Sequence, residues 1–214
     1  MSDRLKIAVL VSGSGSNLQV LIDEMQAGNL PIEIVGVISN NADAYAITRA
    51  NNVGIETAIF SHAPSGKRMS IATFEKHALA QIQAWSPDLV VLAGFMRVLS
   101  AEFIDGVGYP MINLHPSLLP NYKGLDTHSR VLQAGERYHG CSVHQVTAEL
   151  DAGRVLTQAW LAVNEHDTPT TLAARVQKLE HRLVPFTLQM IATGAIGLQT
   201  GTTTLPLPWK IWLD

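Results

Sequence analysis

Two kinds of segment alternate along the chain, and this alternation constrains the fold more than any other feature. Four short runs are apolar and rich in β-branched residues: 6–12, 32–39, 88–95 and 111–115. Such runs are typical of strands that are buried on both faces. Four helical patterns lie between or after them, at about 16–27, 43–52, 68–85 and 125–134. The alternation predicts an α/β, Rossmann-like fold with a mainly parallel sheet and helices on both faces.

The pattern changes after residue 140. Segments 141–147 and 155–163 alternate apolar and polar residues across a short connection, which predicts an antiparallel C-terminal portion. A long helix is expected from about 168 to 193, with Thr168 as N-cap and Pro169 in its first turn. Pro185 is expected to end or kink this helix. We expect one domain over 1–195, followed by an extended tail over 196–214.

Composition narrows the class of protein. Of the 214 residues, 47% are hydrophobic and 15% charged, which indicates a compact globular chain. The net charge of −3 gives no basic surface for nucleic acid, and the N-terminal apolar run is too short to span a membrane. The single cysteine, Cys141, suggests a reducing compartment. We therefore expect a cytoplasmic protein, a monomer or homodimer, with no nucleic-acid or membrane partner.

A glycine loop, SGSGSNL at 12–18, follows the first expected strand. Free backbone N–H groups at the start of a helix suit a phosphate, and Gly15, Ser16 and Asn17 would supply the donors. A dinucleotide fingerprint would need glycine where Leu18 stands, and no Walker lysine follows. The alternative is a tight strand-to-helix turn without a ligand.

Asn113 and His115 end another expected strand, two residues apart, so both side chains point to the same face. An amide and an imidazole that converge on one point can stabilise an oxyanion. Asp151, in ELDAG, is the best candidate partner for the imidazole. Each residue also has a structural alternative: Asn113 as a cap, His115 as a strand-end histidine, and Asp151 as a turn residue.

A metal site is not expected. His139, Cys141 and His144 lie close together in the sequence. Their spacing on a strand does not match that of zinc ligands, and no second pair accompanies them.

Six strings in order make the chain resemble the phosphoribosylglycinamide formyltransferase family from about residue 6 to about 190. They are VLVSGSGSNL, SNNADAYAITRA, PDLVVLAGFMRVLS, INLHPSLLP, HGCSVHQVTAELDAG and RVQKLEHRLVP. The resemblance implies formyl transfer from 10-formyltetrahydrofolate to the amine of glycinamide ribonucleotide in purine synthesis. The alternatives are a formyltetrahydrofolate deformylase, in which water replaces the amine, or a formyltransferase acting on another amine.

The resemblance also implies roles for individual residues. It makes Asn113, His115 and Asp151 the catalytic trio, with Asp151 keeping His115 charged. The residues that bind the ribonucleotide would be Gly15, Ser16, Asn17, Gln177 and Glu180. The residues that bind the folate would be Arg68, Met96, Arg97, Val98, Leu99, Asn113, Thr147, Ala148, Glu149, Leu150 and Asp151.

The chain departs from the family pattern at several positions. Lys123 and Asp126 stand where the family commonly has proline and histidine, which puts substrate contacts there in question. Cys141 replaces a threonine. Arg68 is assigned to the folate although a gapless register would place Ile71 there.

Overall fold

The computed structural model describes residues 4–61 and 69–198 and the backbone of 209–212. It divides into two compact units, Met1–Ile112 and Asn113–Asp214, and each is described by itself. The boundary falls inside one strand, β5 (Met111–His115).

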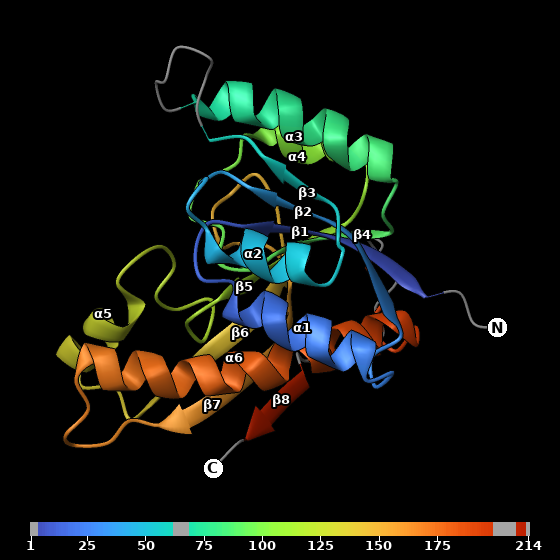
Figure 1. Ribbon diagram of the computed structural model, residues 1–214. Coiled ribbons are helices and arrows are strands. Elements are labelled where there is room, and N and C mark those ends of the chain that lie inside the picture. Colours follow the sequence, from blue (N-terminus) through green and yellow to red (C-terminus); the bar gives the residue numbers. More distant parts are fainter. Residues whose placement is uncertain (1–3, 62–68, 199–208, 213–214) are drawn as a thin grey trace. The chain divides into compact units, whose positions relative to one another are not determined.

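The first unit is built on four parallel strands (Figure 1): β1 (Leu5–Val11), β2 (Ile32–Ser39), β3 (Thr57–Ile59) and β4 (Leu89–Leu92). They lie in the order β3-β2-β1-β4, so the chain crosses over between neighbours. The central strand β1 is buried from Ile7 to Val11, as both faces of the sheet are covered. The mainly parallel sheet is confirmed.

Four helices cover these strands: α1 (Ser16–Gln26), α2 (Tyr45–Asn52), α3 (Ile71–Trp85) and α4 (Ala101–Val107). Helices α1 and α2 lie on one face of the sheet, and α3 and α4 on the other (Figure 1). Helix α3 approaches β2 closely at Gly36, where an added Cβ would lie 2.4 Å from the Trp85 ring.

The second unit carries the antiparallel portion. Strands β6 (Tyr138–Gln145) and β7 (Val155–Ala162) pair antiparallel, and β8 (Trp209–Trp212) adds parallel to β7. Helix α6 (Pro169–Ala192) packs along β6 and β7, and the short α5 (Thr127–Gln133) lies near its start (Figure 1). The antiparallel pair is therefore confirmed.

Helix α6 agrees with its prediction at the start and differs further on. Thr168 is the N-cap, and its side chain accepts from the Thr171 N–H, with Pro169 in the first turn. Pro185 does not end the helix, which continues to Ala192. Burial of its apolar face against the sheet, through Leu183, Val184 and Leu188 among others, outweighs one lost backbone hydrogen bond.

Other differences concern short elements. The strand expected over 88–95 is only β4 (Leu89–Leu92), because the chain turns at Gly94 with φ of 72°. Strand β3 and helix α4 were not predicted. In the expected tail, 209–212 forms β8. That residues 1–195 form a single domain stays a prediction.

Candidate active site

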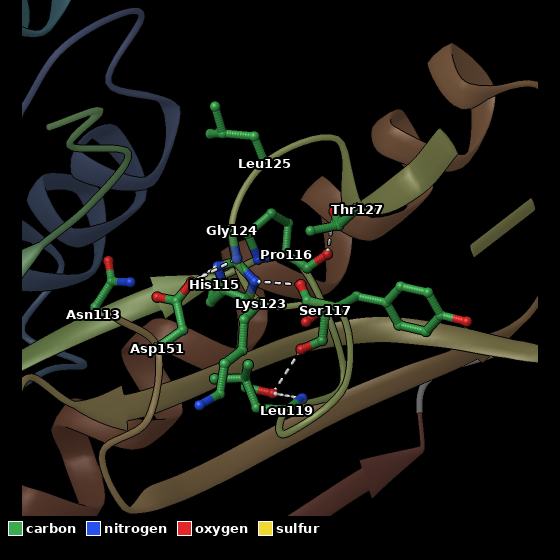
Figure 2. Close-up of polar contacts among 12 residues, drawn as sticks. Asn113, His115, Pro116, Ser117, Leu119, Lys123, Gly124, Leu125, Thr127 and Asp151 are labelled. Carbon is green, nitrogen blue, oxygen red and sulfur yellow. Dashed lines mark hydrogen bonds and ion pairs between the residues drawn. The ribbon is translucent and has the colours of Figure 1, made fainter. Parts of the chain in front are cut away.

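The end of β5 presents two of the three predicted catalytic residues, Asn113 and His115. Asn113 is half-buried and His115 is 6% exposed. Figure 2 shows His115 between Asp151 and the segment that follows β5. The structure thus brings together Asn113, His115 and Asp151, which are up to 38 positions apart in the chain (151 − 113).

The His115 ring has an acceptor at each nitrogen. Nδ1 lies 3.4 Å from Asp151 Oδ2, and Nε2 lies 2.9 Å from the Tyr122 carbonyl oxygen. Both contacts favour the protonated ring, as the sequence argument anticipated for Asp151. Burial outweighs them, and the nearby His144 and Arg130 add to it, so the pKa of His115 falls below its ordinary value. That Asp151 keeps His115 charged stays a prediction.

Asp151 lies on the turn between β6 and β7, in a left-handed conformation with φ of 49°. Its Oδ2 accepts the Gly124 N–H at 2.9 Å, and its Oδ1 lies 3.5 Å from His144 Nε2. Burial by itself raises the pKa of Asp151. The contacts with His144, Gly124 and His115 outweigh burial and hold that pKa below its usual value, so the carboxylate is charged at neutral pH.

His144 is a member of the site that the sequence argument missed. The Asn113 amide nitrogen lies 3.1 Å from its Nε2, and its Nδ1 lies 2.8 Å from the Gln145 carbonyl oxygen. The β6–β7 register shifts between Val143 and His144. Such a bulge re-aims a side chain, and strand alternation in the sequence gives no signal of it.

The segment after β5 supplies backbone groups to the site. Residues 122–125, named here the site loop, contribute the Tyr122 carbonyl and the Gly124 N–H. Lys123 Nζ lies 3.2 Å from Glu149 Oε1. Asp126 is the N-cap of α5, with no side-chain capping bond. The two departures from the family pattern therefore lie in, or directly after, a loop that contacts the catalytic candidates.

The glycine loop lies in the first unit. Gly15 is the N-cap of α1 with φ of 69°, and an added Cβ would lie 2.5 Å from the Ala46 Cβ. Arg49 Nε donates to the Ser14 carbonyl at 2.8 Å. The loop has the backbone form that a phosphate site needs. That it binds a phosphate stays a prediction.

The remaining predicted folate residues lie in two described segments, 96–99 and 147–150, with Arg68 apart from them. Met96 and Val98 are 72% and 66% exposed, so this segment offers apolar surface. Arg97 donates to the Met69 carbonyl at 3.3 Å, and Leu99 is buried. The stretch 147–150 is exposed, and Arg68 lies outside the described residues.

The predicted ribonucleotide residues on α6 lie three positions apart. Gln177 is exposed and Glu180 is half-buried, and this spacing places both on one side of the helix. Within residues 4–61 and 69–198, no group of three or more His, Cys, Asp or Glu side chains could hold a metal ion. No helix in the described part of the chain is long and apolar enough to cross a membrane.

Comparison with known proteins identifies the same chemistry. The formyl transferase profile matches residues 5–188. Phosphoribosylglycinamide formyltransferase of Escherichia coli is 39% identical over 98% of this chain and 94% of its own length. The trifunctional purine biosynthetic protein adenosine-3 of Bos taurus is 41% identical over 91% of this chain, which spans only 19% of that relative.

Solved structures agree in fold. A phosphoribosylglycinamide formyltransferase from Coxiella burnetii, in complex with CHES, is 49% identical with a TM-score of 0.81 and covers 89% of this chain and 88% of its own. The enzyme of the same name from Anaplasma phagocytophilum is 33% identical with a TM-score of 0.86, covering 99% and 100%. The match over nearly the whole described chain, together with the assembled trio, shows that this chain belongs to the formyl transferase family.

Proposed function

We propose that this chain transfers a formyl group from 10-formyltetrahydrofolate to the primary amine of 5′-phosphoribosylglycinamide. The products would be formylglycinamide ribonucleotide and tetrahydrofolate. The observation that carries the proposal is the buried His115–Asp151 contact beside Asn113, in a chain of the formyl transferase family. The family implies a folate-type formyl donor, and the named acceptor comes from the relatives that match along their whole length.

Asn113 and His115 would stabilise the negative charge that builds on the formyl oxygen as the amine attacks. The Asn113 amide carries two N–H groups, and its contact with His144 Nε2 at 3.1 Å would fix the plane of the amide. A donor preorganised in this way is worth about 3 kcal/mol of transition-state stabilisation. The His115 Nε2 faces the Tyr122 carbonyl at 2.9 Å, so the ring would exchange this partner for the formyl oxygen when it donates.

Asp151 would accept the proton of the attacking amine through a water and pass it to the folate nitrogen, which leaves as its bond to the formyl carbon breaks. Its carboxylate is charged and fixed by the Gly124 N–H, so it is ready to act as a base. Its contact with His115 allows the imidazole to gain a proton when the oxyanion forms. Because burial lowers the pKa of His115, the imidazolium would form mainly once the charge that it must balance is present.

The substrates would bind to the surfaces described above. The phosphate would meet the backbone of Gly15, Ser16 and Asn17, and the ribonucleotide would also contact Gln177 and Glu180. The apolar surface of Met96 and Val98 suits a flat heterocycle, as apolar pockets with a few polar groups do. Arg68, Arg97, Leu99 and the stretch 147–151 are the other proposed folate contacts. Deformylation of the folate by water is not favoured, because the relatives that match over their full length are named formyltransferases.

An absorbance assay for tetrahydrofolate formation, with and without the ribonucleotide, tests the proposal. We expect turnover that requires the ribonucleotide, and that falls by at least about 100-fold in His115→Ala and Asp151→Asn. His166→Ala, which changes an exposed histidine of the same unit, serves as the control. Turnover without the ribonucleotide would indicate the hydrolase, and turnover only with a different amine would indicate a changed acceptor.

A further inference from the structure

We propose that Arg130 is a positioning residue for formyl transfer, because it holds the site loop in the conformation that contacts His115 and Asp151. The inference rests on the proposed function. Arg130 lies on α5 and makes no hydrogen bond or ion pair with His115 or Asp151 among the contacts described above. Its charge lowers the pKa of His115, and its hydrogen bonds act through the loop.

The site loop fixes both catalytic candidates through its backbone. The Tyr122 carbonyl meets His115, and two residues later the Gly124 N–H meets Asp151. Both groups belong to the backbone, so they are present whatever the side chains of the loop. The conformation of the loop therefore decides whether the two contacts form. Tyr122 has φ of 57°, a left-handed conformation that is costly for an aromatic residue and persists only where its surroundings hold it.

Arg130 makes the contacts that hold the site loop in this conformation. Its Nη1 donates to the Lys123 carbonyl at 2.6 Å and to the Leu125 carbonyl at 3.2 Å, on either side of Gly124. Its guanidinium also lies over the Tyr122 ring, 5.4 Å from the centroid. One side chain therefore contacts the first, second and last residues of the site loop, and hydrogen bonds from a charged donor are stronger than neutral ones.

The other described contacts of the loop are weaker anchors. In the Lys123–Glu149 ion pair the side chains are 36% and 79% exposed, and exposed ion pairs contribute little. The Tyr122 hydroxyl donates to Glu136 at 2.7 Å, and this contact is exposed, as the Arg130 bonds are, but it acts on the outer end of the side chain and not on the loop backbone. Of the three side chains Arg130, Glu149 and Glu136, only Arg130 bonds to the loop backbone beside Gly124.

Two variants separate the contributions of Arg130. Arg130→Met keeps an apolar stem but removes every donor, whereas Arg130→Lys keeps the charge and part of the donor capacity. Arg137→Met, at an exposed arginine outside the site loop, is the matched control. Two readouts are needed: kcat and KM for both substrates, and the hydrogen-exchange rate of the Gly124 amide, measured by NMR without substrates.

We expect Arg130→Met to lower kcat by about tenfold with both KM values nearly unchanged, and to speed Gly124 exchange by about tenfold. Arg130→Lys should recover part of both effects, and Arg137→Met should change neither. Unchanged Gly124 exchange would overturn the proposal, and so would faster exchange at full kcat. A rise in KM for the ribonucleotide alone would mean that Arg130 binds substrate instead. If the wild-type protein transfers no formyl group, the proposed function fails, while Gly124 exchange still decides whether Arg130 holds the loop.

Discussion

His139 is predicted to make the protein labile in acid. Its side chain is 1% exposed on β6, and its Nε2 lies 3.0 Å from His128 Nδ1. Burial, and then the nearby charges of His128 and His115, lower its pKa from 6.5 to about 4. The folded protein therefore holds His139 neutral over a pH range in which the unfolded chain binds a proton there.

The magnitude follows from the shift. The difference between 6.5 and about 4 is about 2.5 pKa units, and each unit corresponds to about 1.36 kcal/mol, so His139 accounts for about 3 kcal/mol. Because the unfolded state binds more protons, the free energy of unfolding falls as the pH drops from about 6.5 to about 4, and the contribution levels off below that. At pH 7 and above, His139 no longer makes the free energy of unfolding depend on pH.

Urea denaturation of wild type and His139→Gln across pH 7.5 to 4 measures this contribution. We expect the variant to be less stable at pH 7.5, where it loses a buried contact, and to lose about 3 kcal/mol less than wild type on acidification. Thr157→Val is the control, because it breaks the buried Thr157–Thr187 bond of 2.6 Å without changing a titrating group. Parallel pH curves for wild type and His139→Gln would refute the reasoning.

Two further predictions concern Asp151. Asp151→Asn should lower the pKa of His115 further, because the Asp151 carboxylate raises that pKa. An NMR titration of the His115 imidazole measures the change, with Glu149→Gln as control. A rise in the pKa of His115 would contradict the role given to Asp151. Gly153→Ala should disrupt the turn that carries Asp151, because the added Cβ would lie 1.9 Å from the Gln145 carbonyl oxygen. We expect a loss of about 1–3 kcal/mol in thermal or urea unfolding, and normal stability would show that the turn can shift at little cost.

The fold could be predicted wherever a segment was long and uniformly apolar. Strands β2 and β5 were predicted at the bounds that they have, since turn residues or polar residues flank both runs. Strand β3 has three residues and α4 has seven, so both are too short for a periodic pattern of apolar residues to be recognised in the sequence. The continuation of α6 through Pro185 depends on packing against the sheet, which no local pattern reports.

The candidate site divides in the same way. Asn113, His115 and Asp151 stood out by residue type and position, and the structure brings them together. His144 did not, because its direction depends on a register shift within β6. The site loop could not be found either, since it acts through a carbonyl and an N–H group that every loop possesses.

The left-handed backbone of Asp151 limits which substitutions evolution can explore at this position. A φ of 49° is readily adopted by glycine and tolerated by asparagine and aspartate, but it strains other side chains. Glutamate would keep the charge, at the cost of backbone strain and a carboxylate displaced from His115. Asparagine and glycine would keep the turn, but they lack the carboxylate. Of the residues that satisfy the backbone, aspartate alone also satisfies the proposed chemistry, so we expect a substitution at residue 151 that spares the fold to end the proposed activity.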